Sequence, residues 1–185
     1  PALDTVERAV GPVTTLVSNA GVPAMVRGDL LDITAESFDR CMAVNLRGAM
    51  FLMQETARRM LRATQGPYRS ILVVTSVSAG VVSPDRAEYC ISKAGASMMA
   101  SAFAARLAPE GIGVFELRPG IIRTPMTDPV SGRYDARIAE GLVPAGRWGE
   151  PADVGRVAVP LARGDFDFAS GAAIPVDGGL SIHRL

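Results

Sequence analysis

The sequence has very little lysine, histidine, tryptophan or cysteine and no excess of charge. Of its 19 lysine and arginine residues only Lys93 is lysine, and 19 acidic residues bring the formal net charge to zero. A neutral chain does not favour general nucleic-acid binding. The two cysteines, Cys41 and Cys90, show no C-x-x-C or metal-binding spacing, which favours free thiols in a reducing, cytoplasmic compartment and no metal site. No apolar run reaches the about 20 residues of a membrane span.

The 185 residues, 48% of them hydrophobic, are enough for one domain with a substantial core over 1–185. Short β-branched runs alternate with helical stretches, which predicts β-α-β units and an α/β fold with a doubly wound, Rossmann-like parallel sheet. Pro160 should end or kink the last helix early. The predicted strands are 13–18, 70–75, 113–117 and 172–176, and the predicted helices are 4–10, 34–62, 84–109, 133–141 and one beginning at 150–151.

Small, polar and glycine residues follow each of these four strands. In a parallel sheet the carboxyl ends of the strands share one edge, and ligands bind in the crevice beyond it. The sequence therefore predicts a site at this edge, formed by Asn19-Ala20-Gly21, Thr75-Ser76, Pro119-Gly120 and Asp177-Gly178-Gly179.

The single lysine stands four residues after Tyr89, one helical turn away on the same face. An ammonium beside a phenol lowers its pKa from about 10 toward the working range of a general acid or base. The alternative is an exposed helix lysine near an aromatic residue. If Ser76 also donates to a substrate oxygen, the chemistry is carbonyl or alcohol redox, and a nicotinamide cofactor is implied because no side chain supplies a hydride.

These segments resemble the short-chain dehydrogenase/reductase family. Ser18-Asn19-Ala20-Gly21 is similar to the family's Asn-Asn-Ala-Gly turn, and Ser76 stands thirteen residues before Tyr89, as the family's serine does. Asn45 resembles the helix asparagine that holds a water against the lysine. The segment from Pro119 to Thr124 is similar to the one that grips the nicotinamide carboxamide. The C-terminal part, Trp148–Pro151 through Val176–Gly179, looks like the 3-oxoacyl-(acyl carrier protein) reductase branch.

The resemblance implies a catalytic set of Asn45, Ser76, Tyr89 and Lys93. It also implies NADP(H) or NAD(H) as cofactor, contacted by Asn19, Ala20, Gly21, Tyr89, Lys93, Pro119, Gly120, Ile122 and Thr124. The implied reaction is NADPH-dependent reduction of a 3-oxoacyl thioester, as in fatty acid biosynthesis. The partner is a small-molecule carbonyl substrate, either free or carried on acyl carrier protein. The alternatives are an NAD-dependent dehydrogenase of a sugar or other secondary alcohol, and a non-catalytic structural subunit of the same fold.

The family's glycine-rich phosphate loop does not occur in this sequence. Gly111-Ile112-Gly113 has no third glycine and is better explained as a helix C-cap and strand entry. At about 30 residues per β-α unit, two N-terminal units are expected to precede this chain, which would be the C-terminal part of the full domain. The strand at 13–18 would then lie at an edge, and the NAD or NADP preference would depend on residues outside the chain.

The helix of Tyr89 has no charged residue between Lys93 and Arg106. A helix that is apolar on all sides is buried on all sides. We therefore expect a symmetric contact with a second copy, alongside the 34–62 helix, that gives a homodimer or homotetramer.

Overall fold

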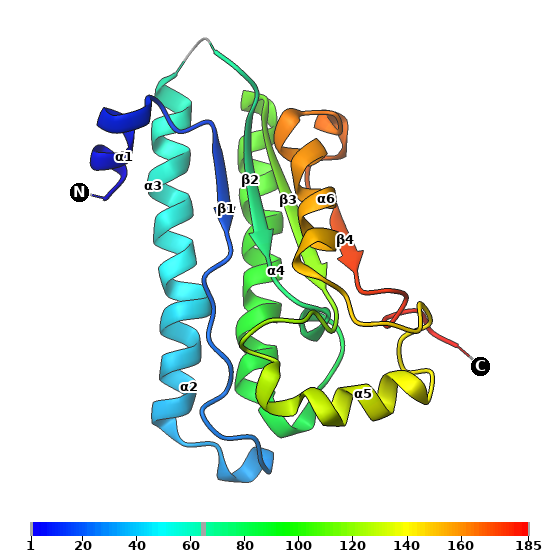
Figure 1. The fold of residues 1–185 in the computed structure, drawn as a ribbon. Coiled ribbons are helices and arrows are strands. Elements are labelled where there is room, and N and C mark those ends of the chain that lie inside the picture. The colour runs from blue at the N-terminus through cyan, green and yellow to red at the C-terminus, as the bar shows by residue number, and fades with distance from the viewer. Residues whose placement is uncertain (1, 64–65, 185) are drawn as a thin grey trace.

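The computed structural model describes residues 2–63 and 66–184. Within them, β1 (Thr15–Ser18), β2 (Arg69–Val74), β3 (Ile112–Pro119) and β4 (Ala173–Val176) form one sheet in the order β1-β2-β3-β4. All three pairings are parallel, as predicted, and the strands point toward the same end of the molecule (Figure 1). β1 is an outer strand of this sheet, in agreement with the expectation for 13–18.

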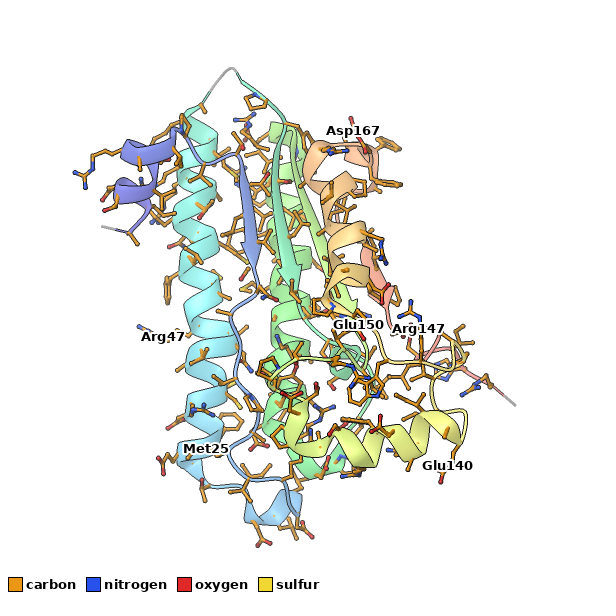
Figure 2. The ribbon with its side chains drawn as sticks, in the orientation of Figure 1. Met25, Arg47, Glu140, Arg147, Glu150 and Asp167 are labelled. Atoms are coloured by element: carbon orange, nitrogen blue, oxygen red, sulfur yellow. The ribbon has the colours of Figure 1, made fainter. Side chains whose placement is uncertain are left out.

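One face of the sheet is covered by the predicted 34–62 helix and by the helix of Tyr89. The first consists of α2 (Ala35–Cys41), a π-helical segment (Met42–Gly48) and α3 (Ala49–Arg62), and the Thr34 hydroxyl accepts from Ser37 N at its start. The second is α4 (Ala87–Leu107). Their side chains pack on the strands in a core that includes Met53, Met60, Ile71, Val114 and Leu107. On the outer side Arg47 points away from the sheet (Figure 2).

The opposite face is covered by α6 (Pro151–Arg163), which packs Leu161 against Leu72, Phe115 and Leu117. Helices on both faces confirm the doubly wound α/β architecture. Of the two outcomes expected at Pro160, an early end or a kink, the early end is wrong, because α6 continues to Arg163. Pro160 lies in the last turn, so its missing N–H removes a single hydrogen bond from the helix.

The other described elements lie at the ends of the sheet. α1 (Ala2–Val10) is joined to α3 by ion pairs from Arg59 to Asp4 and Glu7. α5 (Ser131–Ala139) matches the helix predicted at 133–141 and crosses beyond the carboxyl ends of the strands (Figure 1). Short 3-10 turns occupy Leu30–Asp32, Val77–Ala79, Pro84–Arg86, Ala108–Glu110, Asp128–Val130 and Asp167–Ala169. No helix in the described part of the chain is long and apolar enough to cross a membrane.

Candidate active site

The strand registers bring the predicted segments to one edge. Ser18 lies opposite Val73, Val74 opposite Leu117, and Pro119 opposite Val176, so the residues that follow these strands are neighbours. Gly120 N donates to Val176 O at 3.0 Å. A Cβ added at Gly120 would lie 2.7 Å from the Cβ of Asp177, so glycine is required where β3 and β4 leave the sheet.

Ser76 and Tyr89 meet just beyond β2. Ser76 begins the 3-10 turn Val77–Ala79, and its Oγ accepts from Ser78 N at 3.1 Å. This leaves the hydroxyl proton of Ser76 free for another acceptor. Tyr89, in the first turn of α4, is buried and hydrogen-bonds to Ser76. The two side chains that the sequence selected for binding one substrate oxygen therefore lie together.

Lys93 is buried one turn further along α4. Its Nζ donates to Val74 O at 3.1 Å and lies 5.7 Å from the centroid of the Tyr89 ring. Burial disfavours the ammonium and lowers the pKa of Lys93 from 10.5 to about 8. The lysine is thus no exposed helix residue.

The pKa of Tyr89 differs from the expectation. Burial raises it above 10.0, while the Ser76 hydrogen bond and the charge of Arg86 act in the lowering direction. Lys93 is not among the largest effects on the pKa of Tyr89. The expectation considered one nearby charge and no desolvation, and in this structure desolvation is the largest effect.

Asn45 lies in the π-helical segment and joins two parts of the site. Its side chain accepts from Val22 N at 2.7 Å and donates to Val22 O at 3.0 Å and to Ser92 Oγ at 2.9 Å. A Cβ added at Gly21 would lie 3.4 Å from Asn45 Oδ1 and 3.5 Å from Lys93 Nζ. The Asn45 side chain is therefore held close to Lys93, with Gly21 between them.

The predicted cofactor-binding residues differ in their accessibility. Asn19 and Ala20 are exposed where β1 ends, whereas Ile122 is buried and pairs with Gly149 in an isolated parallel bridge. Thr124 N donates to Thr127 Oγ1 at 3.0 Å, and the two threonine hydroxyls lie 3.4 Å apart. The structure thus places Thr124 in a tight turn after β3, beyond Pro119 and Gly120.

Sequence reasoning did not select Arg86. This residue ends the 3-10 turn Pro84–Arg86, and its guanidinium carbon lies 5.1 Å from the centroid of the Tyr89 ring. One of its nitrogens donates to Ser78 Oγ and to Ser83 Oγ, both at 3.2 Å. Arg86 stands three residues before Tyr89 within the predicted helix 84–109, a spacing at which helical side chains can meet, so the sequence carried a signal for this contact that was overlooked.

A buried carboxylate, Glu116 of β3, was also not selected. It accepts from Thr75 Oγ1 at 2.5 Å, from Ser97 Oγ at 2.8 Å and from Arg118 Nε at 2.8 Å. Burial raises the pKa of Glu116, but the hydrogen bonds and charge of these partners hold it below its usual range. The network links the residue before Ser76, the helix of Lys93 and the strand end before Pro119.

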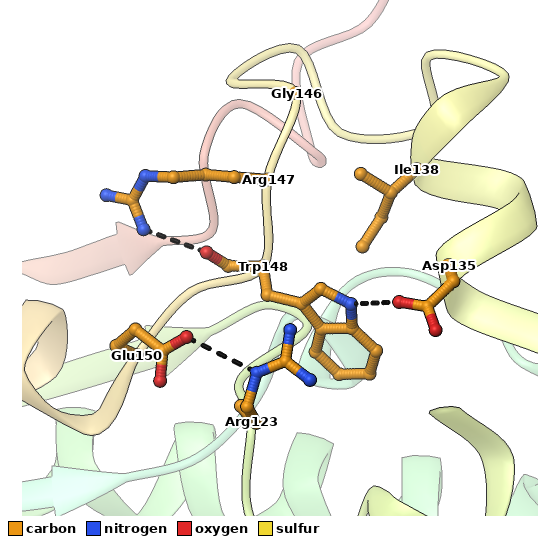
Figure 3. Close-up of a pocket in the computed structure, with 7 residues that line it drawn as sticks. All are labelled: Arg123, Asp135, Ile138, Gly146, Arg147, Trp148 and Glu150. Carbon is orange, nitrogen blue, oxygen red and sulfur yellow. Dashed lines mark hydrogen bonds and ion pairs between the residues drawn. The ribbon is translucent and has the colours of Figure 1, made fainter. Parts of the chain in front are cut away.

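Two cavities lie away from these catalytic candidates. One, of about 260 Å³, lies beside Trp148, whose Nε1 donates to Asp135 at 2.7 Å (Figure 3). The Arg123 guanidinium covers the indole at 4.7 Å and bonds to Glu150. The other, of about 310 Å³, lies between Ile121 and the 175–179 segment. Neither is lined by Ser76, Tyr89 or Lys93, and no group of three metal-ligating side chains occurs among the described residues.

Comparison with known proteins agrees with this arrangement. A family model described as Enoyl-(Acyl carrier protein) reductase matches residues 1–181. The 3-oxoacyl-[acyl-carrier-protein] reductase MabA of Mycobacterium tuberculosis is 38% identical over 98% of this chain and 71% of the relative. L-rhamnose 1-dehydrogenase (NAD(P)(+)) of a Sphingomonas species is 34% identical over 98% of this chain and 72% of the relative.

A solved structure is similar over nearly the whole chain. The 3-oxoacyl-[acyl-carrier protein] reductase from Brucella melitensis, crystallised in complex with NAD, is 52% identical with a TM-score of 0.97, over 99% of this chain and 73% of that one. These matches show that the chain is an NAD(P)-dependent oxidoreductase. The chain belongs to the short-chain dehydrogenase/reductase family.

Proposed function

We propose that the protein reduces the 3-oxo group of an acyl thioester with NADPH, and that residues 1–185 belong to a single Rossmann-like domain. The observation that supports this most is the grouping of Ser76, Tyr89 and Lys93 within one buried cluster, with Asn45 held beside Lys93. Relatives named 3-oxoacyl-[acyl-carrier-protein] reductase at 38% and 52% identity support the substrate class.

Each residue of the cluster has a proposed role. Ser76 donates its hydroxyl proton to the substrate carbonyl oxygen and stabilises the charge that develops there, while its Oγ accepts from Ser78 N. Tyr89 donates its phenolic proton to the same oxygen as general acid. Lys93 provides a positive charge near the phenol. Asn45 fixes the turn after Gly21 through its two hydrogen bonds to Val22.

The residues present fit the nicotinamide half of a dinucleotide. Gly21 leaves open the position that a Cβ would fill next to Asn45 and Lys93, and Lys93 Nζ has donor capacity beyond its bond to Val74 O. The residues that would hold the cofactor are Asn19, Ala20, Gly21, Tyr89, Lys93, Pro119, Gly120, Ile122 and Thr124. The nicotinamide, when bound, would supply the hydride.

The test compares substrates and cofactors in one assay. The protein is given NADPH with a 3-oxoacyl thioester, free and carried on acyl carrier protein, and in parallel NAD with sugars and other secondary alcohols. The second candidate function, a sugar dehydrogenase, is favoured by the 34% identity to L-rhamnose 1-dehydrogenase. Faster turnover of sugars would replace the first proposal by the second. Absence of any turnover by protein that binds NADPH would favour a non-catalytic subunit.

A cytoplasmic location stays a prediction.

We also propose that the protein is a homodimer or homotetramer. The outer side of α4 exposes Ile91 and Met98, which are 50% and 71% accessible, and α3 exposes Phe51 at 53%. No charged residue interrupts α4 between Lys93 and Arg106. A second copy of the same surface would cover these apolar side chains. A monomeric mass in solution at micromolar concentration would contradict this proposal.

A further inference from the structure

Arg86 is a half-buried arginine without an acidic partner beside Tyr89. Its guanidinium carbon lies 5.1 Å from the ring centroid, and its Nη2 is held at 3.2 Å by the hydroxyls of Ser78 and Ser83. The Nε of Arg86 is buried and has no hydrogen-bond partner among the described residues. An arginine placed only for structure would be expected to use its donors more completely.

The neighbouring carboxylate does not compensate this charge. Asp85 pairs instead with Arg27 at 3.2 Å and with Arg133 at 3.3 Å. Within residues 2–63 and 66–184, no ion pair to Arg86 is formed. Its positive charge therefore acts on the ring that it covers, because partial burial reduces screening by water.

We propose that Arg86 is a positioning residue of the active site, whose permanent charge, held in place by Ser78 and Ser83, prepares Tyr89 to exchange its proton with the substrate. This inference rests on the proposed function. As the carbonyl receives its hydride, the O–H bond of Tyr89 breaks, its proton goes to the substrate oxygen and the phenolate remains. Alcohol oxidation reverses this step, so a nearby positive charge favours the phenolate form on which oxidation depends.

The other groups around Tyr89 do not provide an equivalent charge. Ser76 is neutral and contributes a hydrogen bond, and the thiols of Cys90 and Cys41 act on the tyrosine in the opposite direction to Arg86. Lys93 lies 5.7 Å from the ring, but burial lowers its pKa to about 8. Glu88, on α4, is turned to Ser37 of α2, which donates to it at 2.7 Å. An arginine stays charged above pH 8, whereas Lys93 loses its charge there.

The first experiment measures the ionisation of Tyr89 without turnover. Protein labelled with ¹³C at the tyrosine Cζ atoms is titrated, and the Tyr89 signal is assigned with Tyr89→Phe. At pH about 10, near the ordinary tyrosine pKa, the ionised fraction should fall in Arg86→Gln and recover in Arg86→Lys. Arg133→Gln is the matched control, because it removes one positive charge bound to Asp85 without touching the ring. An unchanged fraction in Arg86→Gln, or an equal fall in the control, would overturn the inference.

The second experiment measures the pH dependence of alcohol oxidation. In Arg86→Gln, the rate of alcohol oxidation at neutral pH should fall at least about threefold. The rate should recover as the pH rises, because a higher pH ionises Tyr89 without the help of the arginine. A uniform loss at every pH would show a merely structural role. If Arg86→Gln does not fold, Ser83→Ala, which removes one anchor of the guanidinium, should give a smaller change in the same direction, and no change would count against the inference. Failure of the proposed reaction would leave the ¹³C titration to decide on Arg86.

Discussion

Replacing Lys93 by methionine should change how stability depends on pH. Lys93 is buried on α4, and its Nζ has an acceptor in Val74 O but no carboxylate partner among the described residues. Burial lowers its pKa from 10.5 to about 8. Methionine has a similar length and carries no charge, so it removes the titration while keeping most of the packing.

The sign follows from proton binding. Between pH 8 and 10.5 the unfolded chain keeps its proton on Lys93 and the folded protein does not, so the free energy of unfolding rises with pH in this window. Each pKa unit corresponds to about 1.36 kcal/mol. The wild type should therefore gain about 3 kcal/mol of stability relative to Lys93→Met between pH 7 and 10.5.

The assay is urea unfolding of the cofactor-free proteins at several pH values from about 7 to 10.5, followed by circular dichroism. Comparing two variants at each pH cancels titrations that they share. Arg106→Met is the control, because Arg106 is 65% exposed and pairs with Glu110 one turn away, so its stability difference from wild type should stay flat. A difference for Lys93→Met that is equally flat would refute the reasoning from burial.

Three further predictions concern other parts of the structure. Tyr89→Phe should lower carbonyl reduction by about 10²–10⁴-fold with little effect on folding, and a variant that keeps more than about a tenth of the wild-type rate would argue against Tyr89 as the proton donor. Glu116→Gln should lower the free energy of unfolding by about 1–3 kcal/mol at neutral pH, measured by urea unfolding. Because the pKa of Glu116 is lowered, this difference should shrink as the pH falls through that pKa in the folded state, and a constant difference would contradict it. Met98→Asp, on the exposed side of α4, should reduce the mass measured by light scattering, whereas the same mass as wild type would place the contact elsewhere.

The fold could be predicted to a large extent because its signals are local. The β-branched runs at 13–18 and 70–75 became β1 and β2 within two residues at each end. The spacing of Tyr89 and Lys93 placed both on one helix, and the strand ends were correctly assigned to one edge. These inferences need only the periods of helices and strands and the geometry of parallel sheets.

The electrostatics of the site could not be predicted in the same way. The pKa of Tyr89 depends most on burial, which follows from the packing of the whole fold, and to a smaller extent on Ser76 and Arg86. Glu116 and Arg118 are a different case. Two charged residues, two apart in an otherwise apolar strand, lie on one face of the sheet and must be paired there. That signal was present in the sequence and was overlooked.

The π-helical segment Met42–Gly48 makes the site sensitive to chain length. Hydrogen bonds in this segment span five residues rather than the four of an α-helix, so deleting one residue would remove the wider turn and displace the residues before it relative to α3. A helix could still form, but Asn45 could no longer face Val22 and Ser92 while Ser37 faces Glu88. Insertions and deletions should therefore be tolerated in the loop 22–33 far more readily than in 42–48, where a substitution keeps the angular phase of the helix and a change of length destroys it.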